Sequence, residues 1–350
     1  MLKYRRRTYH DPGQGIGTGL VAPDGNARRP GFWLAVKNPV MMCLNEALGT
    51  GADPILRETR YAAANAALVA IVVAVALLQF LAAPLVLPAG VLGAPALVLL
   101  LMLTTPLHWG LMHESIHGNL FSDAAANRRA GRLLGWFLCL SWDVMRFGHL
   151  LHHSNNRHEF DRPEAVPPGG SRSRGAVPYF AKLLGGHALI SAASSFGLAL
   201  PSRLFRRMIP KAEPMHAASL RAFTNRERQM RIRTDVSGIV VLLVLGSLGW
   251  GSRWPLFAAT IAARFLMLSL VDNAPHYGTA LDSGTYARNT RLPRWASWLV
   301  TGHNFHGVHH GATGLKWQEL SSAFAQKSAQ YDGSWLAMVL RQFRGPMVLD

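Results

Sequence analysis

Long uncharged stretches dominate the middle of the chain and predict its main elements. Residues 61–113 contain no Asp, Glu, Lys or Arg. About 20 apolar residues cross the hydrocarbon core of a bilayer, so this stretch accommodates two transmembrane helices, at about 62–84 and 91–108. Pro88 and Gly90 are suited to the turn between them.

A second apolar block, 236–271, is interrupted by Gly249-Trp250-Gly251-Ser252-Arg253-Trp254-Pro255. This interruption predicts two more transmembrane helices, at about 236–250 and 255–271. Its tryptophans lie where an aromatic belt at the membrane interface is expected. The pattern therefore predicts an all-α integral membrane fold with four transmembrane helices.

Composition supports a membrane protein, because 49% of residues are hydrophobic and only 16% are charged, against about 25% charged in soluble domains. We divide the chain into a cytoplasmic N-terminal tail with an interfacial segment (1–60), a membrane domain (61–320) and a cytoplasmic C-terminal segment (321–350). Cys43 and Cys139 are too few for a disulfide framework or an iron–sulfur cluster.

The basic residues are placed as the positive-inside rule predicts. Lys and Arg number 36 against 19 Asp and Glu, and nine of them lie between Pro201 and Thr234. The presumed outer turns carry only Arg253. We therefore expect the termini and the central loop in the cytoplasm, at the inner membrane if the protein is bacterial. This distribution disfavours nucleic-acid binding.

Residues 176–200 are also apolar, with Lys182 as their only charge. A full crossing here would put the later histidines on the opposite side of the membrane from the earlier ones. We therefore expect an interfacial or re-entrant segment. With four crossings, all the histidine clusters described next fall at cytoplasmic helix ends.

Three histidine clusters carry the candidate chemistry. Their spacing places imidazoles three and four residues apart, on one face of a helix, and a lone histidine follows the last apolar block. The nine predicted ligands are His113, His117, His149, His152, His153, His276, His306, His309 and His310. Nine are too many for one four-coordinate ion, so we expect two metals with four or five histidines each. Imidazole binds iron, copper, nickel and zinc alike.

Five further residues are expected beside these ligands: Glu114, Asp161, Asp272, Asn304 and His303. Glu114 and Asp161 are expected to orient ligand imidazoles by hydrogen bonding. Asp272 can bind metal, orient His276, or pair with Arg264, which must face the protein interior. His303 can share a helix face with the third cluster.

The remaining histidines are set apart. His108 lies five residues before His113, about 140° away around a helix, and is excluded from the ligands. His10, His187 and His216 have no partners in sequence and are interpreted as structural or solvated.

Two other functional classes fit part of the pattern. Residues 113–117 match the H-E-x-x-H signature of zinc metalloproteases, in which the Glu is the general base. An intramembrane zinc protease, however, leaves the other histidine clusters unexplained. A metal transporter predicts ligands at mid-membrane depth, whereas these clusters lie at helix ends.

The motifs resemble the histidine boxes of the membrane fatty acid desaturase and hydroxylase superfamily. The likeness covers about residues 60–320 and lies in four segments: 113–121, 149–153 with Asp161 and Pro163 downstream, 272–278, and 304–310. Gly311-Ala312-Thr313 stands where the family often has Leu-x-Pro. Carotenoid or alkane hydroxylases and ketolases of the same superfamily therefore remain alternatives.

The resemblance implies a cytoplasmic helical cap holding two irons, bound by the nine histidines. It further implies that O2 is used to remove hydrogen from an unactivated C–H bond of a fatty acyl or other lipid chain, by desaturation or hydroxylation. The chain has no flavin, NAD or haem motif, so an external ferredoxin, rubredoxin or cytochrome is expected to supply electrons. The arginine-rich residues 203–233 are a predicted dock for that carrier.

Overall fold

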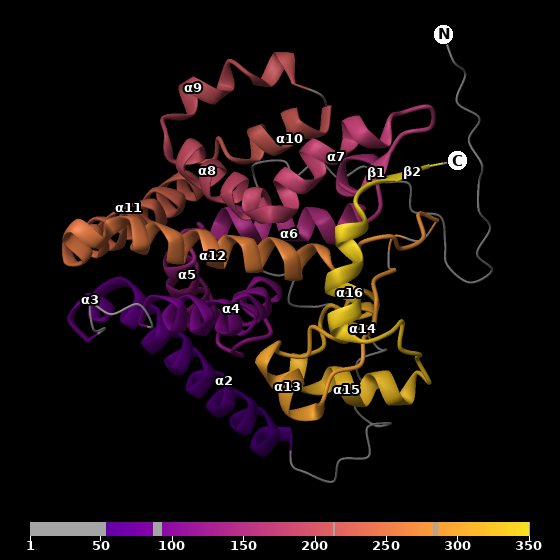
Figure 1. The fold of residues 1–350 in the computed structure, drawn as a ribbon, viewed down its shortest axis with the longest axis horizontal. Helices are drawn as coiled ribbons and strands as arrows, with labels where there is room; N and C mark the ends of the chain where they lie inside the picture. Colours follow the sequence, from indigo (N-terminus) through magenta and orange to yellow (C-terminus); the bar gives the residue numbers. More distant parts are fainter. Residues whose placement is uncertain (1–53, 87–92, 213, 283, 285, 350) are drawn as a thin grey trace. The chain divides into compact units, whose positions relative to one another are not determined.

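Helices make up most of the protein in the computed structural model, which describes residues 54–349 except 87–92, 213, 283 and 285 (Figure 1). Most of the predicted tail, 1–60, lies outside these residues. One two-residue parallel strand pair, which the sequence did not predict, joins β1 (Ala165–Val166) to β2 (Met347–Val348). The expectation of a mostly helical fold is confirmed.

The first uncharged stretch forms two long helices, as predicted. The first is α2 (Pro54–Leu77), which continues through a π-helical turn (η1, Leu78–Ala82) into α3 (Ala83–Val86). The second, α4 (Gly93–His117), runs well beyond the predicted end at residue 108. Its extra turns include Glu114 and Ser115 as well as apolar residues and the first two predicted ligands, and it ends only at Gly118, whose φ of 83° favours glycine.

The second apolar block forms a helical hairpin. Its arms are α11 (Arg226–Trp250) and α12 (Trp254–Asn273), joined by a 3₁₀ turn (η5, Gly251–Arg253). Gly251 has a φ of 53°, a conformation that glycine adopts readily. A Cβ at Gly246 would come within 2.4 Å of the Phe257 ring, so the two arms approach closely near the turn (Figure 1).

Three segments of the described chain are long and apolar enough to cross a membrane: 55–82, 93–117 and 226–273, the last including the hairpin turn. A fourth candidate is a pair of helical segments, Arg172–Ala199 and Ser202–Lys211, bent by 107°. Such a bend occurs in broken spans and in re-entrant loops. The bent pair contains residues 176–200, for which the sequence predicts an interfacial or re-entrant segment.

The bent pair has five parts, and it packs mainly against the hairpin. They are α7 (Arg172–Ala181), η3 (Lys182–Gly186), α8 (His187–Ala199), α9 (Ser202–Arg206) and η4 (Ile209–Lys211). Both α8 and η3 contact α12, and α8 also contacts α11. A short helix, α10 (Pro214–Ala222), then leads into α11.

Two helices between these blocks connect the site to the bundle. They are α5 (Ala124–Phe137), which packs against α4, and α6 (Trp142–Asn155). Just before α6, Ser141 donates a hydrogen bond from its Oγ to the buried Asp235 of α11 at 2.9 Å. This bond fixes the start of the helix that carries the second histidine cluster.

The C-terminal quarter is built from short helices that pack on the same compact unit as the rest of the described chain. They are α13 (Arg294–Leu299), α14 (His306–Gly311), α15 (Trp317–Gln326), α16 (Trp335–Arg341) and the 3₁₀ turn η6 (Gln342–Arg344). The buried Gln342 side chain donates to Leu270 O at 2.9 Å and accepts from Asn273 Nδ2 at 2.6 Å. These bonds attach the C-terminal segment to the end of α12.

Glycines allow close packing inside the bundle. A Cβ on Gly238 would lie 2.8 Å from the Trp136 ring, and one on Gly131 would lie 2.3 Å from Trp142. Hydrophobic burial contributes little to association between helices in lipid, so close van der Waals contact at small residues matters more. The rigid bundle produced in this way holds the helix ends that carry the histidines.

Candidate metal centre

Four separate segments bring the predicted ligands together. The last turn of α4 carries His113 and His117, α6 carries the second cluster, and α14 carries the third. His276 lies in the turn that follows α12, and this turn closes at Gly278, which has a φ of 65°. Segments far apart in sequence thus supply one set of imidazoles.

The first group contains five histidines: His113, His117, His149, His153 and His309. Each offers one ring nitrogen, and these nitrogens all lie within 4.8 Å of one another. The Nε2 atom of His149 lies 3.0 Å from that of His117 and 3.0 Å from that of His153, while Nε2 of His309 lies 3.3 Å from that of His153. The five ring nitrogens therefore surround one small volume.

The second group is formed around His152, His276 and His310, which meet the same 4.8 Å condition. His306 joins them, because its Nε2 lies 3.1 Å from Nε2 of His276 and its ring centroid is 4.7 Å from that of His310. The nine predicted histidines thus divide into five and four. The remaining candidate, His303, forms an overlapping group with His113 and His306.

Many nitrogens in these groups are buried and lack a hydrogen-bond partner within the described chain. They are His113 Nε2, His276 Nδ1, His306 Nδ1, His309 Nδ1 and His310 Nε2, together with His303 Nε2. A buried polar atom without a partner costs about 1–3 kcal/mol. In His276, His306 and His309 the orphaned atom is Nδ1, while Nε2 faces a neighbouring imidazole. Converging Nε2 lone pairs fit a metal ion, which would also provide a partner for the orphaned Nε2 atoms of His113 and His310.

Burial also keeps these imidazoles neutral. Burial lowers the pKa of His303 to about 4, and burial together with the neighbouring histidines lowers the pKa of His153 to about 3. The pKa values of His149, His276 and His309 fall well below the usual range for the same reasons. Neutral imidazole is the form that binds metal, so no proton has to leave at pH 7.

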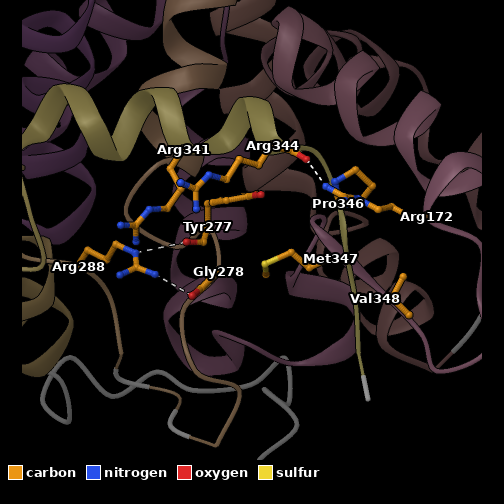
Figure 2. A pocket seen from close by; sticks show the side chains of 9 residues that line it. All are labelled: Arg172, Tyr277, Gly278, Arg288, Arg341, Arg344, Pro346, Met347 and Val348. Atoms are coloured by element: carbon orange, nitrogen blue, oxygen red, sulfur yellow. Dashed lines mark hydrogen bonds between the residues drawn. The ribbon is translucent and has the colours of Figure 1, made fainter.

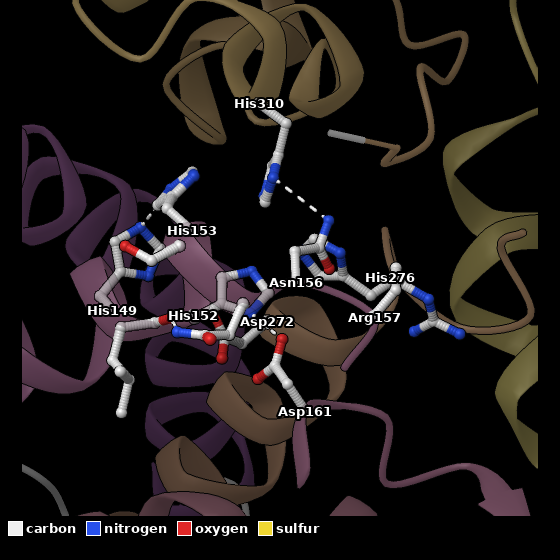
Figure 3. A network of polar contacts seen from close by, with 12 residues as sticks. His149, His152, His153, Asn156, Arg157, Asp161, Asp272, His276 and His310 are labelled. Atoms are coloured by element: carbon white, nitrogen blue, oxygen red, sulfur yellow. Dashed lines mark hydrogen bonds and ion pairs between the residues drawn. The ribbon is translucent and has the colours of Figure 1, made fainter. Parts of the chain in front are cut away.

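Two polar residues support the second group of histidines (Figure 3). The ring of His152 donates from Nδ1 to Asp161 Oδ2 at 2.7 Å, which leaves its Nε2 available for a metal. Asn156 was not singled out from the sequence, and its Nδ2 lies 3.4 Å from Nδ1 of His310. It follows the second cluster by three residues but belongs to no recognisable motif.

Glu114 and Asn304 stabilise the surrounding loops. Glu114 accepts a hydrogen bond from the Trp317 backbone N–H at 3.1 Å, and its other oxygen is 3.7 Å from His113 Nδ1. Asn304 accepts from Ser297 Oγ at 2.6 Å and donates to the Thr290 carbonyl at 3.3 Å. The first therefore ties α4 to α15, and the second holds the loop before α14.

The suggested pairing of Asp272 with Arg264 is wrong. Asp272 instead lies 3.3 Å from His187 Nε2, so His187 has a partner that the sequence did not reveal. Arg264 donates to Gln79 Oε1 at 2.8 Å and bonds His108 within the bundle. Helix packing, which spacing alone does not specify, decides both pairings.

A cavity of about 400 Å³ reaches the histidines. His149, His152, His276 and His306 form part of its lining. The rest of the lining is mixed. It is apolar at Trp109, Val144, Met145, Leu183 and Ile190, and it is polar or charged at Asp161, Lys182, His187, Ser191, Ser194, Ser269, Asp272 and Asn273. A lipid chain is the kind of molecule that such a lining accommodates.

A family model described as fatty acid desaturase matches residues 91–341, more than half of the chain and all nine predicted ligands. No curated protein and no solved structure matches the chain. The match therefore concerns the whole arrangement of helices and histidines rather than one motif.

Proposed function

The chain belongs to the fatty acid desaturase family, and we propose that it is a membrane oxidoreductase using O2 and two iron ions to desaturate or hydroxylate an unactivated position of a lipid chain. The observation that carries the proposal is the convergence of nine histidines, most of them buried, with five in one group and four in the other. Two metals with four or five imidazoles each keep positions open for oxygen ligands.

Each group would hold one iron. His113, His117, His149, His153 and His309 would bind the first, and His152, His276, His306 and His310 the second. When bound, the irons supply the O2-dependent oxidation that side chains alone do not perform. The protein contributes fixed geometry and neutral ligands.

The chain's own residues have defined tasks in this proposal. Asp161 accepts from Nδ1 of His152 and so fixes the orientation of that ring. The apolar lining around Trp109, Met145 and Leu183 binds the chain and excludes water beside the histidines. Exclusion of water limits side reactions of an oxidising centre.

The proposal places the site on the cytoplasmic side and takes electrons from an external carrier of the ferredoxin, rubredoxin or cytochrome type. The basic residues of 203–233 support the orientation through the positive-inside rule. The same surface is available to an acidic carrier.

The geometry disfavours a zinc protease. A protease base must reach the water on the metal, whereas Glu114 accepts from the backbone of Trp317 and is oriented toward α15. Carotenoid or alkane oxidation within the same family remains compatible with the apolar cavity, and it differs only in the substrate.

Metal analysis combined with lipid analysis tests the proposal. Protein purified after expression with iron should contain two irons per chain, and host lipids should gain a double bond or a hydroxyl group detectable by mass spectrometry. His309→Ala is the matched inactive control. One zinc per chain with peptide cleavage, or unchanged lipids with an iron-loaded enzyme and a working donor, would contradict the proposal.

A further inference from the structure

A second concavity, of about 520 Å³, is lined by residues that directly follow His276 and by the C-terminal segment (Figure 2). We call it the arginine cleft. Four arginines line it, Arg172, Arg288, Arg341 and Arg344, together with Tyr277 and Gly278. No carboxylate is among its lining residues.

The positive charge of the arginine cleft is poorly compensated. The guanidinium groups of Arg341 and Arg344 have no hydrogen-bond acceptor among residues 54–349 as far as the structure describes them. Among the described residues, Arg172 donates only to the backbone carbonyl of Arg344, at 2.5 Å. Two carboxylates lie near the cleft, and both have other partners. Asp332 is 3.8 Å from Arg288, and the buried Glu164 accepts from the Gly278 N–H at 3.3 Å and pairs with Arg157 at 2.6 Å.

Arg288 has a different task, because it holds the floor of the cleft. It donates to the carbonyl oxygens of Tyr277 at 3.3 Å and of Gly278 at 2.7 Å. Tyr277 in turn donates from its hydroxyl to Gly345 O at 2.7 Å. The floor is therefore fixed to the C-terminal segment that carries Arg341 and Arg344.

Like charges held in a concave site repel one another, and this arrangement becomes favourable when an anion binds between them. Guanidinium groups match phosphate with parallel, charge-assisted hydrogen bonds. We propose that the arginine cleft binds a phosphate group, carried by a lipid head group or present as a free ion.

The position of the cleft favours a lipid head group. Tyr277 and Gly278 directly follow His276, which lines the lipid cavity. The Tyr277 ring centroid is 6.1 Å from that of Tyr179, another cavity residue. The cleft and the cavity thus share a wall, so a phosphate in one is close to a chain in the other. This head-group form rests on the proposed function, whereas phosphate binding itself does not.

Binding of inorganic phosphate to the purified full-length protein in detergent tests the site without any need for activity. At constant ionic strength, phosphate should raise the thermal midpoint of the wild type in a saturable way. The double variant Arg341→Gln/Arg344→Gln should weaken phosphate binding about tenfold or more. Arg206→Gln, an exposed arginine outside the cleft, is the control and should bind as the wild type does.

A second measurement separates the two sources of phosphate. Short-chain phosphatidic acid binding about tenfold more tightly than inorganic phosphate supports the head-group form, while equal affinities support a free-ion site. Absence of saturable binding, or unchanged affinity in the double variant, would overturn the proposal. So would a double variant that changes only the KM for a reduced electron carrier, since the cleft would then be a protein dock. Lack of lipid oxidation with intact phosphate binding would count against the proposed function alone.

Discussion

Two buried polar networks along α4 contain histidines with opposite surroundings. Inside the bundle, His108 donates from Nε2 to Leu134 O at 2.8 Å, and its Nδ1 accepts from Arg264. At the end of the same helix, His113 has a buried Nε2 without a partner in the described chain. Only five positions separate these two residues.

The comparison teaches that burial alone does not identify a ligand. A buried imidazole with both nitrogens satisfied by protein groups contributes to stability. A group of imidazoles with unsatisfied nitrogens pointing at one another carries a free-energy cost, at about 1–3 kcal/mol for each orphaned atom. That cost is offset when a cation binds, which is why the second network indicates a function and the first does not.

The largest effect is expected when one predicted ligand is removed from each group of histidines, which tests directly whether these histidines, unlike His108, bind metal. His309→Ala and His276→Ala should each reduce lipid oxidation below detection, because each removes a ligand that no other residue replaces. Iron content measured by mass spectrometry should fall below two per chain in both.

The matched control is His108→Ala, on the same helix as the first group. It should keep two irons per chain. Full activity in either ligand variant, or loss of iron in the control together with normal folding by circular dichroism, would contradict the division between the networks.

Lowering the pH of the metal-free protein should expose the cost of keeping the site neutral. Unfolded histidine takes up a proton near pH 6.5, whereas the folded protein lowers the pKa of His303 to about 4 and that of His153 to about 3. The unfolded state therefore binds more protons below about pH 6.5, and the free energy of unfolding should fall as the pH drops from there toward these values.

Thermal midpoints of chelator-treated protein between pH 7.5 and 4.5 measure this dependence. His303→Gln removes one of the depressed groups, so its midpoints should change less steeply with pH. A variant with the wild-type slope would show that His303 does not contribute to the effect.

In the network around His108 inside the bundle, substitution should mainly lower the stability of the fold. His108→Ala leaves the Leu134 carbonyl and Arg264 without one partner each and creates a cavity between α4 and α5. We expect the free energy of unfolding to fall by about 2–4 kcal/mol, measured as a lower thermal midpoint in detergent. A midpoint equal to that of the wild type would mean that water or rearrangement satisfies these groups.

The same contrast marks what the sequence could predict. Spacing identified all nine histidines that the structure brings together, because three- and four-residue repeats fix which side chains share a helix face. It also set His108 apart, since five residues leave a net offset of about 140° around a helix, and in the structure both His108 nitrogens bond protein groups. The uncharged stretches also located the first helices, because an apolar stretch of that length is unfavourable in water and long enough to cross a bilayer.

Long-range partners were beyond the reach of spacing. Three roles were open for Asp272, including pairing with Arg264 on its own helix, but it pairs with His187 across the packing of α8 and α12. The arginine cleft unites residues from 172 to 344, which no local pattern connects. The predicted transmembrane helix ended at about residue 108, whereas α4 continues through Glu114 to His117, because its end is set by the turn at Gly118 and not by the end of the apolar stretch.

A smaller effect is expected from the residue that orients one ligand. Asp161→Asn keeps the shape of the side chain but weakens its bond to Nδ1 of His152. Loss of such an orienting carboxylate typically costs about 10–100-fold in metal affinity or activity. Activity should fall within that range, and excess iron should restore part of it. Asp123→Asn, at the exposed start of α5, is the control and should remain fully active.

Substitution of Glu114 tests whether this carboxylate, which lies beside a predicted ligand, has a structural role or takes part in the reaction. In Glu114→Gln the remaining side-chain oxygen can still accept from the Trp317 backbone N–H, so the link between α4 and α15 persists. We expect lipid oxidation to fall less than about tenfold, since the bond is neutral rather than charge-assisted but is not lost. If Glu114 were instead the general base of a metalloprotease, Glu114→Gln would abolish peptide cleavage, because an amide does not take up the proton.

Assays of lipid oxidation and of peptide cleavage on the same preparation distinguish the two roles. Loss of all activity with iron still bound would mean that Glu114 acts at the reacting atoms. Glu114 would then belong to the reactive centre and not to the residues that support it.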